Sequence, residues 1–362
     1  MIRSRGHYGP KNDAAYVAAS THMPLRQHPT TFPRCRRGLT NPWNLKGNEM
    51  TSFRHALPQL RGEPFLTDGG IETSLIFHHG LDLPLFASYV LLDAEEGRAA
   101  LKAYYRDYLK LSTARGVGFL LESPTWRCST GWGARLGHDG EAVAAFNRDA
   151  VRLMEELRDE TASPAPIVIS GNIGPRGDGY AVEQRLTEDE AERYHSHQIR
   201  TFADTAADMV TAVTMTHTEE AIGIVRAAGA VDMPVAIAFT TETDGRLPSG
   251  ETLAEAIEAV DHATGSAAAY YMINCAHPDH FADALEGGDW RARIRGVRAN
   301  ASRKSHAELD ESDTLDPGDP EELARDYVRL RRMLPNLSIF GGCCGTDHRH
   351  IERIGDACLA AA

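Results

Sequence analysis

The sequence predicts an α/β protein built on a single (β/α)8 TIM barrel, and three observations predict this fold. From residue 64 onward, short apolar runs alternate with longer amphipathic stretches, as in a parallel sheet whose strands are each followed by a covering helix. The unit repeats eight times, which favours a closed barrel over an open sheet. An open sheet usually carries a glycine-rich phosphate loop after its first strand, and Asp68-Gly69-Gly70 is too short to be one.

The expected elements follow in chain order. Apolar runs predict strands at 64–70, 118–126, 166–174, 208–215, 234–241, 269–276, 294–302 and 337–345. Amphipathic stretches predict helices at 95–115, 140–160, 187–206, 217–229, 251–263, 278–286, 319–333 and 348–360. Thr187 precedes three acidic residues, which fits a helix N-cap followed by negative charge at the positive end of the helix dipole. The polar stretch 302–320 is long for a loop between a strand and a helix, as lids and mobile loops are.

The first 49 residues differ from the rest of the chain in composition. They hold eight Lys or Arg against two Asp or Glu, and they show no sustained apolar period. We therefore divide the chain into a disordered N-terminal extension, 1–49, and a barrel domain, 50–362. The whole chain has a formal net charge of −13, so the barrel domain is acidic. This charge argues against nucleic acids and anionic membranes as partners, because both are polyanions, and no apolar run reaches the roughly 20 residues of a membrane span.

Polar residues gather where the expected strands end. Active sites in this fold lie at the carboxyl ends of the strands. Asp68 ends the first strand, Glu122 and Thr125 end the second, and Asn300 lies near the end of the seventh. Glu122 is either a carboxylate of the site or the end of a buried hydrogen-bond network. These four residues are candidates for binding a substrate.

Three of the six cysteines, Cys275, Cys343 and Cys344, fall at the ends of the sixth and eighth expected strands. These strands are next-nearest neighbours in a barrel of eight, so their ends can face one central point. Three thiolates around one point suit Zn²⁺, which favours sulfur ligands in a tetrahedron. Adjacent side chains on a regular strand point to opposite faces, so Cys343 and Cys344 can share a metal only where the backbone leaves strand geometry. The glycines around them supply that freedom.

Three protein ligands leave one position of a zinc ion open, as in a catalytic site. A thiol that enters this position ionises, because the cation stabilises the thiolate, which can then attack an activated methyl group. Two other interpretations remain open at this point. Cys343 and Cys344 can form a vicinal disulfide with a redox role, and a structural zinc would need a fourth protein ligand.

Two further sets of residues are expected to play no part in the site. The remaining cysteines are expected to be inert thiols: Cys35, Cys128 and Cys358. The histidines on expected helices are expected to be solvated: His195, His197, His348 and His350. Because the cysteines are few for the length, the sequence predicts a reducing, cytoplasmic location rather than a secreted, disulfide-stapled domain.

The cysteine motifs resemble those of a known family. Gly-Gly-Cys-Cys-Gly-Thr at 341–346, followed by His350-Ile351, resembles the closing motif of the homocysteine S-methyltransferase family. Three further segments resemble motifs of that family in the same order, between about 64 and 356: Asp68-Gly69-Gly70, Gly171-Asn172-Ile173-Gly174-Pro175, and Asn274-Cys275 with Pro278. The resemblance implies a (β/α)8 barrel and the transfer of a methyl group to homocysteine, which gives methionine.

The resemblance also implies roles for individual residues. Cys275, Cys343 and Cys344 match the zinc ligands of the family. Asp68 lies where the family binds the amino group of the acceptor, Asn300 matches an asparagine close to the zinc, and Thr125 matches a residue of the site.

This sequence departs from the family at the expected acceptor site. Val213 stands where the family usually has a glutamate that helps to hold the amino group of homocysteine. The motif at the end of the second strand is also altered, with Ser123, Pro124 and Trp126 in unusual positions. An ammonium group loses affinity when its carboxylate partner is missing. The acceptor is therefore homocysteine, bound differently, or a related thiol.

The methyl donor is expected to be a small onium compound. The family uses S-methylmethionine, S-adenosylmethionine, glycine betaine or methylated cobalamin, and its cobalamin- and folate-dependent members carry extra domains that a chain of 362 residues has no room for. Aromatic faces often hold such cations, and Trp126 and Trp132 are candidates, with ordinary packing as the alternative.

Two other functions remain open. One is a zinc-dependent hydrolase on the same barrel, although no His-x-His lies at a strand end. The other is a zinc-binding module without catalysis. The expected partners are a small thiol acceptor and a methyl donor, and the sequence makes no prediction about the oligomeric state.

Overall fold

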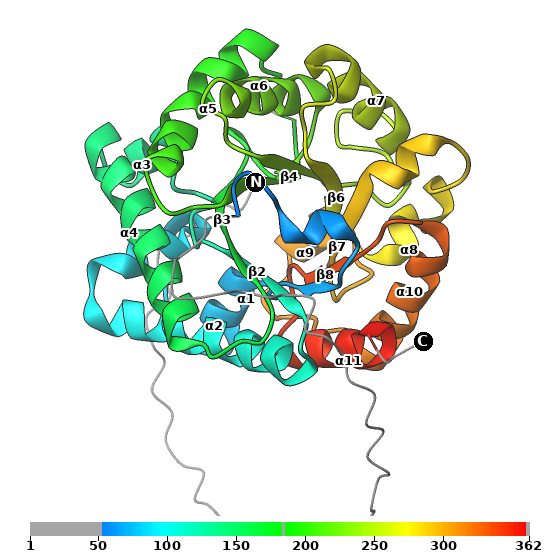
Figure 1. Ribbon diagram of the computed structural model, residues 1–362, viewed down its shortest axis with the longest axis horizontal. Coiled ribbons are helices and arrows are strands. Elements are labelled where there is room, and N and C mark those ends of the chain that lie inside the picture. Colours follow the sequence, from blue (N-terminus) through cyan, green and yellow to red (C-terminus); the bar gives the residue numbers. More distant parts are fainter. Residues whose placement is uncertain (1–52, 183–184, 360–362) are drawn as a thin grey trace, which may run out of the picture. The chain divides into compact units, whose positions relative to one another are not determined.

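The computed structural model describes residues 53–182 and 185–359, and these form a closed barrel of eight parallel strands in chain order (Figure 1). The strands are β1 (Phe65–Leu66), β2 (Gly118–Glu122), β3 (Ile167–Ile173), β4 (Met209–Met215), β5 (Val235–Phe239), β6 (Tyr270–Asn274), β7 (Ile294–Ala299) and β8 (Ile339–Gly342). Strand β1 pairs with both β2 and β8, which closes the barrel. The predicted (β/α)8 TIM barrel is confirmed. The predicted disordered extension, 1–49, lies outside the described residues.

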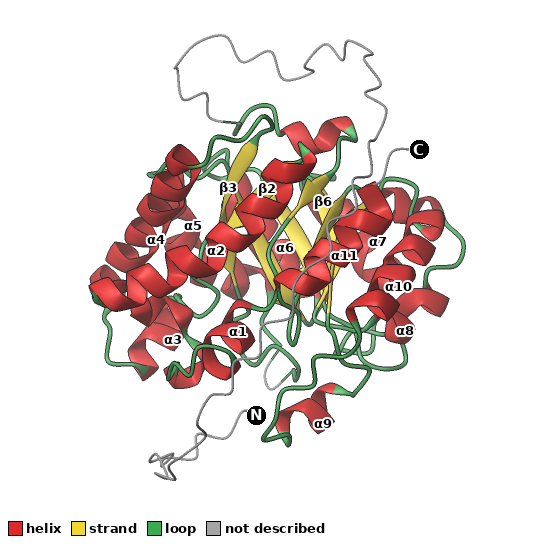
Figure 2. Cartoon of the chain, turned by 90° about the horizontal axis from the view of Figure 1, so that it is seen from below, coloured by secondary structure: helices red, strands yellow, loops and turns green. Residues whose placement is uncertain are grey.

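Helices surround the strands in both views (Figures 1 and 2). They are α1 (Ile71–Phe77), α2 (Glu95–Arg115), α3 (Thr130–Arg135), α4 (Gly140–Glu160), α5 (Glu188–Ala203), α6 (Thr218–Gly229), α7 (Leu253–Thr264), α8 (Pro278–Phe281), α9 (His306–Asp310), α10 (Pro320–Met333) and α11 (His348–Leu359). Short 3₁₀ helices lie at Pro58–Arg61, Pro84–Phe86, Ser88–Asp93, Ala282–Ala284 and Asp289–Arg293. Within the described part of the chain, no helix has the length and apolar character that crossing a membrane requires.

Strand residues alternate between two buried clusters. One cluster packs together and holds one side chain or more from seven of the strands: Phe65, Leu120, Val168, Met209, Val213, Ala236, Ala238, Tyr270, Met272 and Ile339. Their strand neighbours instead pack in a larger cluster with the helices: Leu66, Phe119, Leu121, Ile169, Val210, Ala212, Ile237, Tyr271, Ile273 and Phe340. Because successive side chains of a strand point to opposite faces, the first cluster fills the barrel and the second joins it to the helices.

Most of the strands are shorter than expected at their carboxyl ends, and β4 ends at Met215 as expected. Strand β1 ends at Leu66 rather than at Gly70, and β8 ends at Gly342 rather than at Gly345. The chain leaves strand geometry at these points to build the loops of the barrel mouth. The N-cap at Thr187 is confirmed, because its side chain accepts from Glu190 N–H in a capping box. The expected polar loop at 302–320 contains the short helix α9, which has a capping box at Ser305.

Candidate active site

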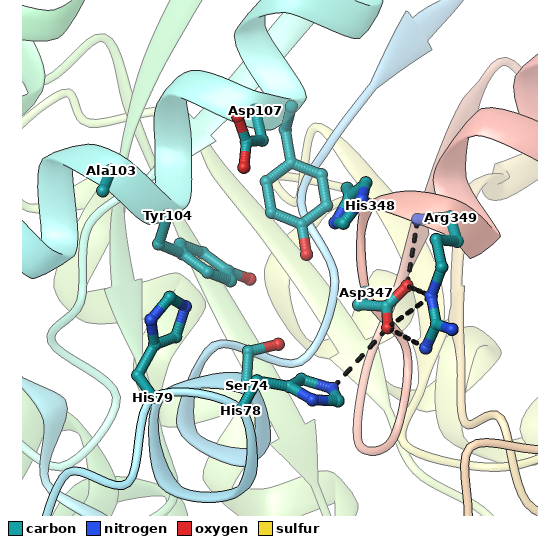
Figure 3. Close-up of a pocket in the computed structure, with 10 residues that line it drawn as sticks. Ser74, His78, His79, Ala103, Tyr104, Asp107, Asp347, His348 and Arg349 are labelled. Carbon is teal, nitrogen blue, oxygen red and sulfur yellow. Dashed lines mark hydrogen bonds and ion pairs between the residues drawn. The ribbon is translucent and has the colours of Figure 1, made fainter. Parts of the chain in front are cut away.

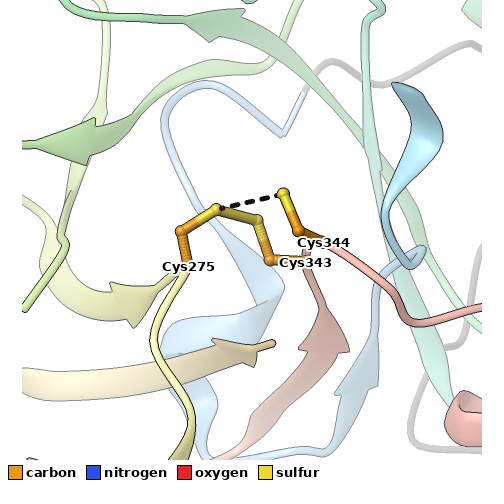
Figure 4. A group of neighbouring side chains, drawn as sticks. All are labelled: Cys275, Cys343 and Cys344. Carbon is orange, nitrogen blue, oxygen red and sulfur yellow. Dashed lines mark hydrogen bonds between the residues drawn. A yellow bond between two sulfur atoms is a disulfide. The ribbon is translucent and has the colours of Figure 1, made fainter. Parts of the chain in front are cut away.

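The three cysteines at the ends of β6 and β8 lie together (Figure 4). Their sulfur atoms are all within 4.8 Å of one another, and Cys275 Sγ and Cys344 Sγ are 3.9 Å apart. A tetrahedral zinc ion with Zn–S bonds of about 2.3 Å holds its sulfur ligands about 3.8 Å apart. In the structure Cys275 and Cys343 form a disulfide and Cys344 is free, so the pairing is not the vicinal one considered from the sequence. Once this disulfide is reduced, the three residues fit a zinc site.

The backbone at Cys275 adopts an uncommon conformation. Its φ is 54°, in the left-handed region, which costs a residue other than glycine roughly 1–3 kcal/mol. The amide of Cys275 donates to the carbonyl of Arg298 (3.1 Å). The carbonyl of Cys275 accepts from Asn300 Nδ2 (3.0 Å) and lies 2.6 Å from His306 Nε2. These contacts hold the turn that aims the sulfur toward the other two cysteines.

Strand β7 also holds the double-cysteine segment. The amide of Cys343 donates to the carbonyl of Ala299 (2.8 Å), and the amide of Ala301 donates to the carbonyl of Cys344 (3.0 Å). Of the three neighbouring glycines, Gly345 has a positive φ of 81°. Gly341 and Gly342 instead lie where a Cβ atom would collide with Thr67 and Thr346. The predicted departure from strand geometry therefore begins after Gly342. Gly345 allows the turn, and Gly341 and Gly342 allow the backbone to lie close to Thr67 and Thr346.

Arg298, which the sequence analysis did not single out, lies between two of the candidate carboxylates. Its Nη2 is 2.7 Å from Asp68 Oδ1, and its Nη1 forms an ion pair with Glu122. Asp68 also accepts from Thr67 Oγ1 (2.9 Å) and from Tyr104 Oη (2.9 Å). Asp68, Glu122 and Arg298 are all buried, at 2 %, 2 % and 6 % exposure. Glu122 is thus buried beside a cation of the protein, and substrate binding by Asp68 and Glu122 stays a prediction.

A second residue missed by the sequence analysis covers the sulfur atoms. Tyr180, in the loop after β3, places its hydroxyl 3.3 Å from Cys344 Sγ and 3.7 Å from Cys275 Sγ. Its ring stacks on His306, with centroids 4.1 Å apart, and His306 Nδ1 lies 3.2 Å from Glu242 Oε1. Tyr180 and His306 thus come from the loops after β3 and β7 and meet at the sulfur atoms. In the sequence, Tyr180 lies in a glycine-containing stretch after the third strand, and nothing in that stretch indicates that it folds over the cysteines.

The fold and the site agree with the comparison to known families. The family model described as homocysteine S-methyltransferase matches residues 65–358. The chain belongs to the homocysteine S-methyltransferase family. It is therefore a methyltransferase, and the family supports activity on a thiol.

Solved structures show the same fold. The oxidised form of the homocysteine methyltransferase MmuM from Escherichia coli is 17 % identical, covers 82 % of this chain and 98 % of its own, and has a TM-score of 0.66. The metallated form is 18 % identical, covers 81 % and 95 %, and has a TM-score of 0.64. A search of curated protein sequences gave no match.

The other two candidate residues of this homocysteine S-methyltransferase family member lie at the same end of the barrel. Thr125 is fully buried, and its hydroxyl bonds Asn172 O (2.7 Å) and Ser123 Oγ (2.7 Å), so it ties the ends of β2 and β3 together. Asn300 contacts the carbonyl of Cys275, and among the described residues its Oδ1 has no hydrogen-bond partner although it is buried. Substrate binding by Thr125 and Asn300 stays a prediction.

The two tryptophans considered for the methyl donor already hold a cation of the chain. The guanidinium of Arg127 lies 4.0 Å from the ring centroid of Trp126 and 3.6 Å from that of Trp132. Arg135 lies 4.2 Å from the Trp132 ring as well. Trp132 Nε1 donates to Pro175 O (3.2 Å), at the start of the loop that carries Tyr180. Ordinary packing, the alternative considered from the sequence, therefore describes these rings better than donor binding.

The expectation of solvated histidines was wrong for two of the four. His195 and His350 are buried, whereas His197 and His348 are exposed. His195 Nε2 lies 2.9 Å from Glu220 Oε1, and His350 Nε2 lies 2.8 Å from the carbonyl of Pro317. Both side chains have polar partners that offset the cost of burial, which the helical pattern alone does not reveal.

Burial changes the ionisation of groups around the cysteines. It raises the pKa of the Cys344 thiol to about 11 and that of the Glu72 carboxyl to about 7. In the absence of a bound cation, the thiol is protonated at neutral pH. A cation bound beside Cys344 would favour its thiolate form.

A separate pocket of about 480 Å³ lies outside the barrel, between α1, α2 and the start of α11 (Figure 3). Its wall includes Tyr104, His78 and Asp347, and His78 Nε2 lies 3.6 Å from Asp347 Oδ2. The Tyr104 hydroxyl bonds Asp68, so this tyrosine separates the pocket from the buried carboxylates. The cysteines do not line this pocket.

Proposed function

We propose that this methyltransferase uses a zinc ion held by Cys275, Cys343 and Cys344 to transfer a methyl group from an onium donor to a small thiol. The acceptor is homocysteine or a related thiol, and the product is methionine or another thioether. The observation that carries the proposal is the convergence of the three sulfur atoms within 4.8 Å at the mouth of the barrel. Zn²⁺ prefers such a donor set, and three protein ligands leave room for a thiol.

When bound there, Zn²⁺ supplies the positive charge that keeps the acceptor in its thiolate form at neutral pH. The acceptor sulfur forms a bond to the methyl carbon while the bond from that carbon to the onium atom breaks. The electron pair of the broken bond stays with the donor, which leaves as a neutral thioether or amine. The family's onium donors, S-methylmethionine, S-adenosylmethionine and glycine betaine, all meet this requirement.

The chain's own residues position and shield the reacting sulfur. Asn300 and His306 hold the carbonyl of Cys275, and Tyr180 covers the cysteines from the opposite loop. A hydroxyl so close to two sulfur atoms can donate a hydrogen bond to a thiolate and stabilise its negative charge. Covering the site also excludes water, which strengthens the electrostatic interactions in it.

The zinc site requires reduced cysteines, whereas the structure joins Cys275 and Cys343. We therefore propose that the protein works in a reducing compartment, such as the cytoplasm. No observation favours the hydrolase or the module without catalysis, since the chain belongs to a family described as homocysteine S-methyltransferase.

The proposal is tested by methyl transfer with reduced, zinc-loaded protein. Each onium donor is combined with homocysteine and with other small thiols, and thioether formation is measured by mass spectrometry. We expect one donor and thiol pair to give product, and Cys344→Ser to abolish it. Cys358→Ser, which changes a buried cysteine on α11 outside the site, is the matched control and should stay active. Zinc-loaded protein that methylates no thiol from any of these donors would refute the proposal.

A further inference from the structure

The place expected to bind the acceptor's amino group holds a cation of the protein itself. Asp68 and Glu122 are the carboxylates that the ends of the first two strands bring into the barrel. Arg298, on β7, forms ion pairs with both. Its guanidinium therefore lies where an ammonium group would otherwise find its partners.

Arg298 is fixed in this place by further contacts. Its Nε donates to the carbonyl of Gly342 (3.0 Å), and its Nη2 also donates to the carbonyl of Gly69 (3.2 Å). At Gly341 a Cβ atom would lie 3.3 Å from Arg298 Cγ, so the glycine makes room for the side chain. A guanidinium with four such partners and 6 % exposure cannot leave without breaking a buried charge network.

Both carboxylates of this cluster form ion pairs with Arg298. Both oxygens of Asp68 accept hydrogen bonds, Oδ1 from Arg298 and Thr67 and Oδ2 from Tyr104. Glu122 forms an ion pair with Arg298 through Oε2, and among the described residues its buried Oε1 has no hydrogen-bond partner.

Two further residues, Glu72 and Val213, do not provide the missing partner for an ammonium group. Glu72 accepts from Ser88 Oγ (2.9 Å), and burial keeps it largely protonated below neutral pH. On β4 the inner wall presents Val213, which packs with apolar side chains inside the barrel. An ammonium group brought here would lose its water and meet a fixed cation, and the acceptor it would find, Glu122 Oε1, belongs to a carboxylate that Arg298 already neutralises.

We propose that the acceptor is a thiol without an ammonium group near its sulfur, a proposal that rests on thiol methylation at the cysteine site. Arg298 is the residue that sets this specificity, because it already neutralises the carboxylates that an amino-acid thiol would use. Neutral or acidic thiols need no such partner. They can reach the cysteines without displacing the guanidinium.

Binding of matched thiols to the cobalt-substituted protein tests this without any methyl donor. Homocysteine and 4-mercaptobutyrate differ only in the ammonium group, as do cysteine and 3-mercaptopropionate. The thiolate-to-cobalt absorption band reports each dissociation constant. We expect the thiol that lacks the ammonium group to bind at least as tightly in both pairs. Homocysteine binding about tenfold tighter or more, the gain from a charge-assisted hydrogen bond, would overturn the proposal.

A variant assigns the effect to Arg298. In Arg298→Met, Asp68 and Glu122 lose their cation. The affinity for homocysteine should therefore rise about tenfold relative to the affinity for 4-mercaptobutyrate. The matched control is Arg293→Met, which removes an arginine that pairs with Asp261 of α7. This variant should leave the ratio of the two dissociation constants, homocysteine to 4-mercaptobutyrate, unchanged. An unchanged ratio in folded Arg298→Met would contradict the assignment. If this variant does not fold, the wild-type pairs still decide.

The two measurements separate the proposed methyl transfer from the proposed acceptor preference. Thiols that bind the cobalt protein but are never methylated would refute the proposed function while the acceptor preference is still measured. No binding of any thiol would refute both, because the acceptor would not reach the cysteines.

Discussion

Glu72 provides a test of the burial around the cysteines. It lies in the first turn of α1, where burial raises its pKa from 4.5 to about 7. The folded protein therefore binds this proton more tightly than the unfolded chain does. The ionised carboxylate destabilises the fold, so this cost is absent below pH 4.5 and complete above about pH 7. About 2.5 pH units at about 1.4 kcal/mol each give an upper limit of about 3.5 kcal/mol.

Glu72→Gln removes this charge while keeping the shape of the side chain. In reduced, metal-free protein we expect the variant to be more stable than the wild type by about 1–3 kcal/mol at pH 8. The gain stays below the upper limit because the amide oxygen of Gln accepts the hydrogen bond from Ser88 less strongly than a carboxylate does. At pH 4.5 the two should differ little. Urea unfolding at both pH values measures the free energies of unfolding.

The matched control is Glu258→Gln, at an exposed position of α7, which should change stability by less than about 0.5 kcal/mol at either pH. A Glu72→Gln protein that is less stable than the wild type at pH 8 would refute the reasoning. So would a difference that does not grow with pH.

Three further changes test the site and the fold. Tyr180→Phe removes the hydroxyl 3.3 Å from Cys344 Sγ, so we expect a shifted thiolate-to-cobalt band and about tenfold weaker metal binding; an unchanged band and affinity would show that the hydroxyl does not act on the sulfur. Gly341→Ala places a methyl group against Thr67 and should cost about 1–3 kcal/mol in thermal or urea unfolding, whereas Gly229→Ala, with open space around it, should not. Thr187→Ala breaks the capping box of α5 and should cost about 1 kcal/mol; equal stability would contradict the capping role.

The barrel could be predicted because its signal repeats along the chain. Eight apolar runs with helical stretches between them are a long-range pattern, and the strands occupy the predicted positions. The short helices α1, α3 and α9 were missed, since a single turn or two carries little periodicity. Most strand ends were placed too far along the chain, because the expected ranges included the polar and glycine residues that form the loops of the barrel mouth.

The cysteine cluster could also be predicted, since topology alone brings the ends of β6 and β8 together. Its covering residues could not. Tyr180 reaches the sulfur atoms through the path of a loop, which no local pattern specifies. Arg298 could have been found from the sequence, because a charged residue near the end of an expected barrel strand needs a partner where it is buried. That partner is the pair of carboxylates taken from the sequence as substrate ligands.

The most direct test of the central claim is the zinc content of freshly reduced protein, measured together with the number of titratable thiols. We predict one zinc per wild-type chain, lost in Cys343→Ser and retained in Cys358→Ser. We also predict that Cys275, Cys343 and Cys344 react with a thiol reagent only after a chelator removes the metal. Reduced wild-type protein that binds no zinc, or Cys343→Ser protein that binds as much as the wild type, would contradict the account.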